Sequence, residues 1–141
     1  MRAKLRDIAQ ASGADPKGAL FDAVAHALPG YEIFHNRVLV ATYIRPEKTK
    51  GGVFLADRTL DEDRFQGKVG LVLKVGPRAF VDDAVNKFDG IKVEVGDWVT
   101  YRASDGRERF LSDETGRAGV PCRLLDDNHI EGRISDPDLI Y

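Results

Sequence analysis

The stretch Gln66–Pro77, which reads QGKVGLVLKVGP, carries the clearest strand pattern in the chain. Its Val and Leu residues alternate in part with small or polar residues, and glycines stand near both ends, as in a β-strand bounded by turns. Outward from it, similar runs recur as NRVLVATYI at 36–44, IKVEVGDWVTYR at 91–102 and CRLLDD at 122–127. Short strands divided by turn residues are typical of a barrel or sandwich, so we predict a mainly all-β fold.

The first 30 residues show helical spacing instead. Apolar residues recur three or four positions apart at Leu5, Ile8, Leu20, Phe21, Val24, Ala25 and Leu28. Asp15–Pro16 fits a helix start and Pro29–Gly30 fits a stop. We therefore predict a helical N-terminal arm at 1–30, too small to fold alone, with partner contacts at Phe21, Val24 and Leu28.

The other predicted boundaries are a β-barrel at 31–134, with a loop at 47–66, and a C-terminal tail at 135–141. Asp136–Pro137 interrupts any strand in the tail. The apolar residues Leu139, Ile140 and Tyr141 follow. An apolar chain end usually docks, so we expect these three residues to contact the barrel or a neighbouring molecule.

The loop contains TKGGVFL at Thr49–Leu55, in which a loose glycine pair precedes three apolar residues. Charged stretches flank it on both sides, RPEK before it and ADRTLDEDR after it. Two interpretations stay open. Val53, Phe54 and Leu55 form either an ordinary barrel strand behind a glycine turn, or an apolar patch that binds a partner.

Composition excludes several classes of protein. The chain has 141 residues, 43% hydrophobic and 31% charged, which is ordinary for a globular domain. A net charge of −2 argues against nucleic-acid binding, and no apolar run reaches the length of a membrane span. The charged N-terminus does not look like a secretory signal. The single cysteine cannot form an intrachain disulfide, which suits an intracellular protein.

We find no motif for catalysis, a metal or a cofactor. His26, His35 and His129 lack metal-site spacing, and there is no phosphate-binding loop. Cys122 opens a predicted strand, so we interpret it as a buried structural thiol. The acidic runs Asp61–Asp63 and Asp126–Asp127 do not match a calcium loop, and we interpret them as solvated loop charges.

Five stretches, taken in order, resemble the GroES co-chaperonin family. They are FHNRVLV at 34–40, EKTKGGVFLAD at 47–57, QGKVGLVLKVGP at 66–77, VEVGDWVTY at 93–101 and CRLLDDNHIEGRI at 122–134. Medium-chain alcohol dehydrogenases contain a similar barrel, but they add zinc ligands and a nucleotide-binding domain that this chain lacks.

The resemblance implies a small antiparallel barrel, no catalysis and a homo-oligomer. It also implies that Gly51, Gly52, Val53, Phe54 and Leu55 form a mobile loop that docks into a groove of a GroEL-type ring. Burial of the apolar triad is worth ~5–8 kcal/mol gross. Ordering the loop costs about 1 kcal/mol or more per residue. A single loop would therefore bind weakly, and a ring of copies firmly.

The chain departs from the family in its N-terminal arm, its charged loop after the triad and its tail. It looks most similar to versions from tailed phages, which suggests two roles. One is a capsid decoration protein on the virion surface, which binds the major capsid protein or copies of itself; this is the role we favour from sequence. The alternative is a phage co-chaperonin in the host cytoplasm. A third possibility is a scaffold whose arm docks another protein.

Overall fold

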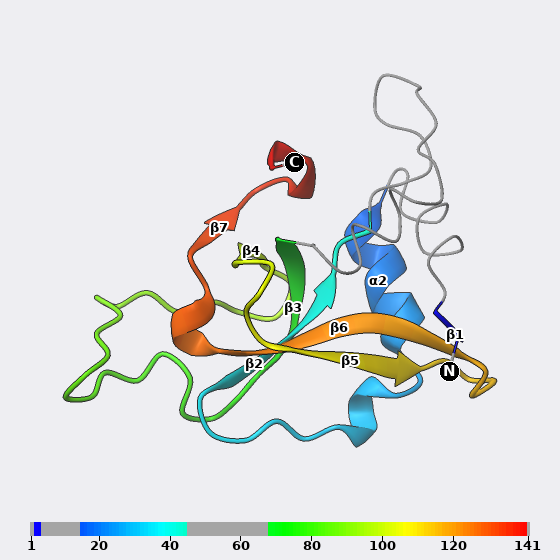
Figure 1. Ribbon diagram of the computed structural model, residues 1–141, viewed down its shortest axis with the longest axis horizontal. Coiled ribbons are helices and arrows are strands. Elements are labelled where there is room, and N and C mark those ends of the chain that lie inside the picture. The colour runs from blue at the N-terminus through cyan, green and yellow to red at the C-terminus, as the bar shows by residue number, and fades with distance from the viewer. Residues whose placement is uncertain (1, 4–14, 45–67, 141) are drawn as a thin grey trace.

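The computed structural model describes residues 2–3, 15–44 and 68–140 (Figure 1). The described part of the chain contains one α-helix, α2 (Pro16–Val24), and otherwise strands, turns and loops. The strands are β1 (Arg2–Ala3), β2 (Arg37–Thr42), β3 (Val69–Val75), β4 (Trp98–Thr100), β5 (Arg107–Ser112), β6 (Ala118–Asp126) and β7 (Gly132–Ile134). Three short 3₁₀ turns are η1 (Leu28–Gly30), η2 (Asp127–His129) and η3 (Pro137–Leu139). The predicted mainly β fold is confirmed.

The described strands form one sheet in the order β1-β6-β2-β3-β4-β7, with β5 on the other side of β6. All pairings are antiparallel except that of β1 with β6. The register of β2 against β3 shifts between Leu39 and Val40, which face Lys74 and Val72. This β-bulge sharpens the local twist and helps the sheet curve around its core.

The central strands are buried on both faces. Along β2, Val38 and Val40 belong to one apolar cluster, whereas Leu39 and Ala41 belong to the other. Side chains of a strand alternate between faces, so a strand covered on both sides is almost continuously apolar. Helix α2 covers the second of these faces. Residues from the segment between β3 and β4 help to cover the first.

Helix α2 begins where its sequence predicts. The Asp15 carboxylate accepts a hydrogen bond from the Gly18 amide at 3.0 Å, and Pro16 occupies the first turn. The helix ends at Val24, earlier than the Pro29–Gly30 stop that we predicted from sequence. Pro29 and Gly30 do not end α2 but lie in the separate 3₁₀ turn η1, which follows it.

The sequence-based view of two other segments needs revision. Arg2–Ala3, within the predicted helical arm, form a short strand parallel to β6, with Arg2 opposite Ala118. The predicted strand at 91–102 is reduced to β4, because 94–97 form a turn with Gly96 at φ +96°. The backbone amide of Glu94 donates to the Asp97 carboxylate at 2.9 Å and closes that turn.

Candidate partner-binding site at the exit of strand β2

The chain leaves the sheet after Ile44 and returns at Lys68, and these two points lie side by side. Thr42 is the register partner of Gly70, and the Tyr43 amide donates to the Val69 carbonyl at 3.0 Å. The segment 45–67 therefore starts and ends at one place on the sheet, which we call the stem and define as Tyr43, Ile44 and Lys68. The predicted binding residues Gly51, Gly52, Val53, Phe54 and Leu55 lie outside the described residues.

Aromatic packing holds the stem. Tyr43 and Ile44 are both buried, and the Tyr43 ring meets the Trp98 ring edge to face at a centroid distance of 5.4 Å. Edge-to-face pairs of this kind stabilise beyond the area that they bury. The Tyr43 hydroxyl donates to the Asp138 carboxylate at 2.6 Å, which joins β2 to the end of the chain.

A second tyrosine supports the stem from the other face of the sheet. The Tyr101 amide donates to the Lys68 carbonyl at 3.0 Å, and its hydroxyl donates to the Val69 carbonyl at 3.3 Å. Burial raises the pKa of Tyr101 to about 12, so the hydroxyl stays protonated as a donor at neutral pH. A Cβ atom on Gly70 would lie 2.8 Å from Val40 Cγ2, so this close approach requires glycine.

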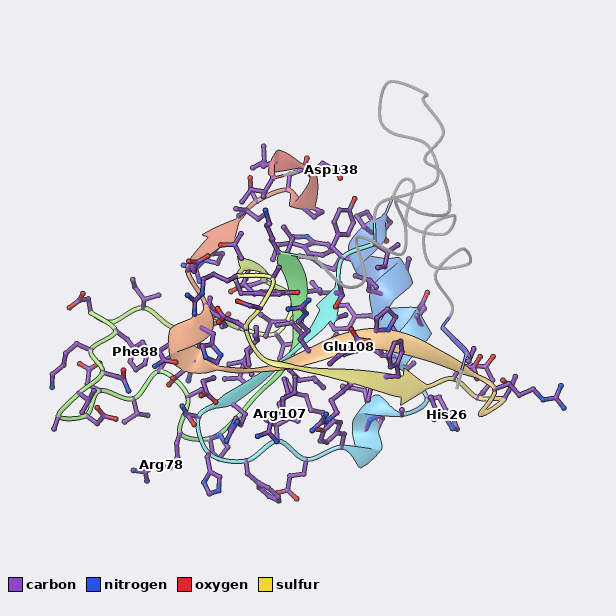
Figure 2. All side chains as sticks on the ribbon, in the orientation of Figure 1. His26, Arg78, Phe88, Arg107, Glu108 and Asp138 are labelled. Carbon is purple, nitrogen blue, oxygen red and sulfur yellow. The ribbon has the colours of Figure 1, made fainter. Side chains whose placement is uncertain are left out.

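The C-terminal tail folds as η3 beside the stem. Asp136 accepts a hydrogen bond from the Asp138 amide at 2.9 Å, and Pro137 is buried. Asp138 lies on this turn at the C-terminal end of the chain (Figure 2). Of the predicted tail contacts, Leu139 and Ile140 are exposed, whereas Tyr141 lies outside the described residues. The Tyr43–Asp138 contact thus joins the tail to the stem, which flanks the predicted binding loop.

The predicted arm residues pack on the chain's own sheet. Val24 is completely buried in the cluster below α2, so it has no surface left for a partner. Phe21 and Leu28 are half-buried against the same cluster. The helical spacing of these residues arises from internal packing, because an amphipathic helix buries its apolar stripe on the nearest sheet face. Only the exposed parts of Phe21 and Leu28 remain available for the predicted partner contact.

The structure places the cysteine and the two C-terminal aspartates that we considered from sequence as possible site residues. Cys122 is buried in the middle of β6, and burial raises the pKa of its thiol. Asp126 pairs with Arg37 at 3.1 Å. Asp127 is buried rather than solvated, which corrects our interpretation of that pair. Among the described residues, no three His, Cys, Asp or Glu side chains are grouped to hold a metal ion.

A second exposed apolar surface could not be recognised from the sequence. The segment between β3 and β4 projects from the sheet on the side away from α2 (Figure 1). It exposes four large apolar side chains, which are Val81, Val85, Ile91 and Val95. Four valine or isoleucine residues within one stretch resemble strand residues in a sequence. Only their exposed positions in the structure separate them from the core.

The comparisons with known proteins agree with this architecture. The family model described as the chaperonin 10 kDa subunit matches residues 31–115, which include the stem and the projecting segment. No curated protein matches the chain. In the part of the chain that the structure describes, no helix is long and apolar enough to cross a membrane. Since the family model covers more than half of the 141 residues, the chain belongs to the chaperonin 10 kDa family.

Proposed function

We propose that this chain is a non-enzymatic co-chaperonin, which binds a GroEL-type chaperonin ring through Val53, Phe54 and Leu55. The observation that carries the proposal is the stem. Its two ends are fixed by the Tyr43–Val69 and Tyr101–Lys68 backbone hydrogen bonds, at 3.0 Å each. These bonds hold Tyr43 and Lys68 on the sheet on either side of the segment that contains TKGGVFL, which supports a role for that segment in binding.

Several copies are needed for firm binding under this proposal. The apolar triad offers ~5–8 kcal/mol gross, and ordering the loop consumes a comparable amount at about 1 kcal/mol per residue. Linked copies bind the second and later sites at a high effective concentration, which turns weak contacts into a stable complex. A homo-oligomer that matches the symmetry of the chaperonin ring meets this requirement.

The test is the ATPase rate of a GroEL-type ring with and without this chain. We expect the wild-type chain to slow ATP turnover and Phe54→Asp to abolish the effect, because a carboxylate cannot enter an apolar groove. The control is Ile91→Asp, which makes the same change at a residue that is 59% exposed on the projecting segment. Full inhibition by Phe54→Asp, or none by the folded wild-type chain, would refute the proposal.

A second candidate is the capsid decoration role favoured from sequence, in the virion instead of the cytoplasm. The sequence ADRTLDEDRFQ at 56–66 supports it, because this charged stretch suits a fixed docking place better than a mobile loop. Against it, α2 and η3 contact the chain's own sheet, so less of their surface remains to bind a capsid shell.

Mass spectrometry of purified virions tests the decoration role. A copy number comparable to that of the major capsid protein would favour it over the co-chaperonin. If the chain appears only in lysates of infected cells, the decoration role is excluded.

A further inference from the structure

The dipeptide Asp–Gly occurs twice in the chain, at Asp89–Gly90 on the projecting segment and at Asp105–Gly106 just before β5. In both places the glycine adopts a φ of +77°, which glycine tolerates because it has no Cβ atom. The two sites thus share their sequence and the conformation of their glycine. They differ in what surrounds the aspartate, and this difference separates their chemistry.

Asp89 lies on an open turn. The amide that closes the turn is that of Ile91, which donates to the Phe88 carbonyl at 2.8 Å, and Asp89 at φ +54° and Gly90 form its middle. Both middle residues are exposed, and Phe88 is labelled on the projecting segment in Figure 2. Within the described residues, no hydrogen bond or ion pair restrains the Asp89 carboxylate. A Cβ atom at Gly90 would have nothing within 4 Å, so the turn has room to rotate.

Asp105 is held firmly instead. It is 7% exposed, and its carboxylate accepts hydrogen bonds from Arg102 Nη2 at 2.9 Å and Arg102 Nε at 3.1 Å. This hydrogen bonding lowers the pKa of Asp105, which keeps its carboxyl group ionised. Its carbonyl accepts from Arg123 Nη1 at 3.0 Å, and a Cβ atom at Gly106 would lie 2.6 Å from Leu125 Cδ2. This site therefore has neither a free carboxyl group nor room for its backbone to rotate.

We propose that Asp89 of the folded protein converts spontaneously to isoaspartate, whereas Asp105 does not. The Gly90 amide nitrogen attacks Cγ of the protonated Asp89 side chain. The amide proton and the carboxyl hydroxyl group leave as water, and a five-membered succinimide ring forms. Glycine favours this step because no Cβ atom shields its nitrogen. The inference is independent of the proposed function.

Water then opens the succinimide ring at one of its two carbonyl groups. If the bond between the Asp89 main-chain carbonyl and the Gly90 nitrogen breaks, the chain runs through Cβ and Cγ and the α-carboxylate becomes free. This product is isoaspartate, and opening at Cγ restores aspartate. Mass and charge are unchanged, but the main chain of the turn is one carbon longer. The free α-carboxylate is the group that an isoaspartate methyltransferase methylates, so the projecting segment becomes a substrate for this class of enzyme.

Ageing of the full chain at neutral pH with mild warming tests the site. Peptide mapping by tandem mass spectrometry locates isoaspartate, and labelling by an isoaspartate methyltransferase measures its amount. In the folded chain we expect isoaspartate to accumulate with time at Asp89 and to stay at its starting level at Asp105. In urea the selectivity should be lost and both aspartates should convert, because the protection of Asp105 comes from its folded surroundings.

The matched variant is Asp89→Glu, which keeps the charge but would have to close a larger, six-membered ring. It should lose the methyl label on the projecting segment while its circular dichroism remains that of the wild type. If this variant does not fold, the comparison of the two sites within the wild-type chain still decides. An unmodified Asp89 in the folded chain, after the urea sample has converted, would overturn the proposal. Equal conversion of Asp89 and Asp105 in the folded chain would overturn it as well.

Discussion

Asp127 shows how much one buried carboxylate can hold in place at the scale of a residue. Its Oδ1 accepts from Asn36 Nδ2 at 3.1 Å and its Oδ2 accepts from the Phe80 amide at 3.0 Å. Its own amide donates to the Asn36 carbonyl at 3.0 Å. The residue thereby joins η2 to the entry of β2 and to the base of the projecting segment. A buried carboxylate of this kind is tolerated because each of its two oxygens accepts a hydrogen bond.

Replacing Asp127 by Ala leaves the Phe80 amide and the Asn36 side chain without their acceptor. We expect the free energy of unfolding to fall by about 2–4 kcal/mol, as for other buried groups that lose a charged partner. Asp127→Asn retains one acceptor oxygen and should lose less. Urea denaturation of the three proteins checks the order. Equal midpoints for Ala and wild type would show that the carboxylate contributes nothing.

At the scale of the element, helix α2 depends on a local cap and on distant packing. The cap is the Asp15 carboxylate on the Gly18 amide at 3.0 Å. Packing comes from Leu20 and Val24, both completely buried. A Cβ atom on Gly18 would lie 2.3 Å from Asp15 Oδ2, so the cap and a side chain at this position compete for the same space.

This competition predicts a non-additive pair of substitutions. Asp15→Ala alone should lower the free energy of unfolding by about 1 kcal/mol through loss of the cap. Gly18→Ala should raise it by about 1 kcal/mol when Asp15 is already Ala, since alanine favours the helix. With Asp15 present, Gly18→Ala displaces the carboxylate and the gain should disappear. A double-mutant cycle by urea denaturation measures the coupling. Strict additivity would mean that the cap and the methyl group coexist.

The same elements show what a sequence can predict. The start of α2 was predictable because Asp15 and Pro16 act locally. Strands β2 and β3 were predictable because both of their faces are apolar. Strand β5 was not, because its sequence RERFLS is mostly polar and, among the described strands, it pairs with β6 alone. The exposure of Val81 and Val85 depends on hydrogen bonds that the Asp82 and Asp83 carboxylates accept from backbone amides, which no periodic pattern reveals.

At the scale of the whole molecule, the hydrogen bond from Tyr43 to Asp138 joins residues 95 positions apart. It connects the stem of the predicted binding loop with η3, which contains the exposed Leu139 and is followed by the exposed Ile140. The sequence predicted both binding elements separately. It could not place them together, because their proximity depends on β7 returning alongside β4.

Tyr43→Phe should release the tail while leaving the sheet folded. The loss of one partly buried hydrogen bond is expected to cost about 1 kcal/mol. Amide exchange within 135–140 should become faster, because η3 loses its attachment to the stem. Tyr101→Phe is the control, since its hydroxyl donates to the Val69 carbonyl at 3.3 Å and not to Asp138. Unchanged exchange of the tail in Tyr43→Phe would show that other contacts hold it.

The packing of Trp98 against Tyr43 has a spectroscopic consequence. The chain contains one tryptophan, so its intrinsic emission, excited beyond the absorption of tyrosine, arises entirely from this position. Trp98 is 5% exposed and packs against Tyr43, a residue of the stem. Its emission wavelength and anisotropy therefore report directly on the stem. Any event that loosens this end of the sheet can be followed optically in the unlabelled wild-type protein.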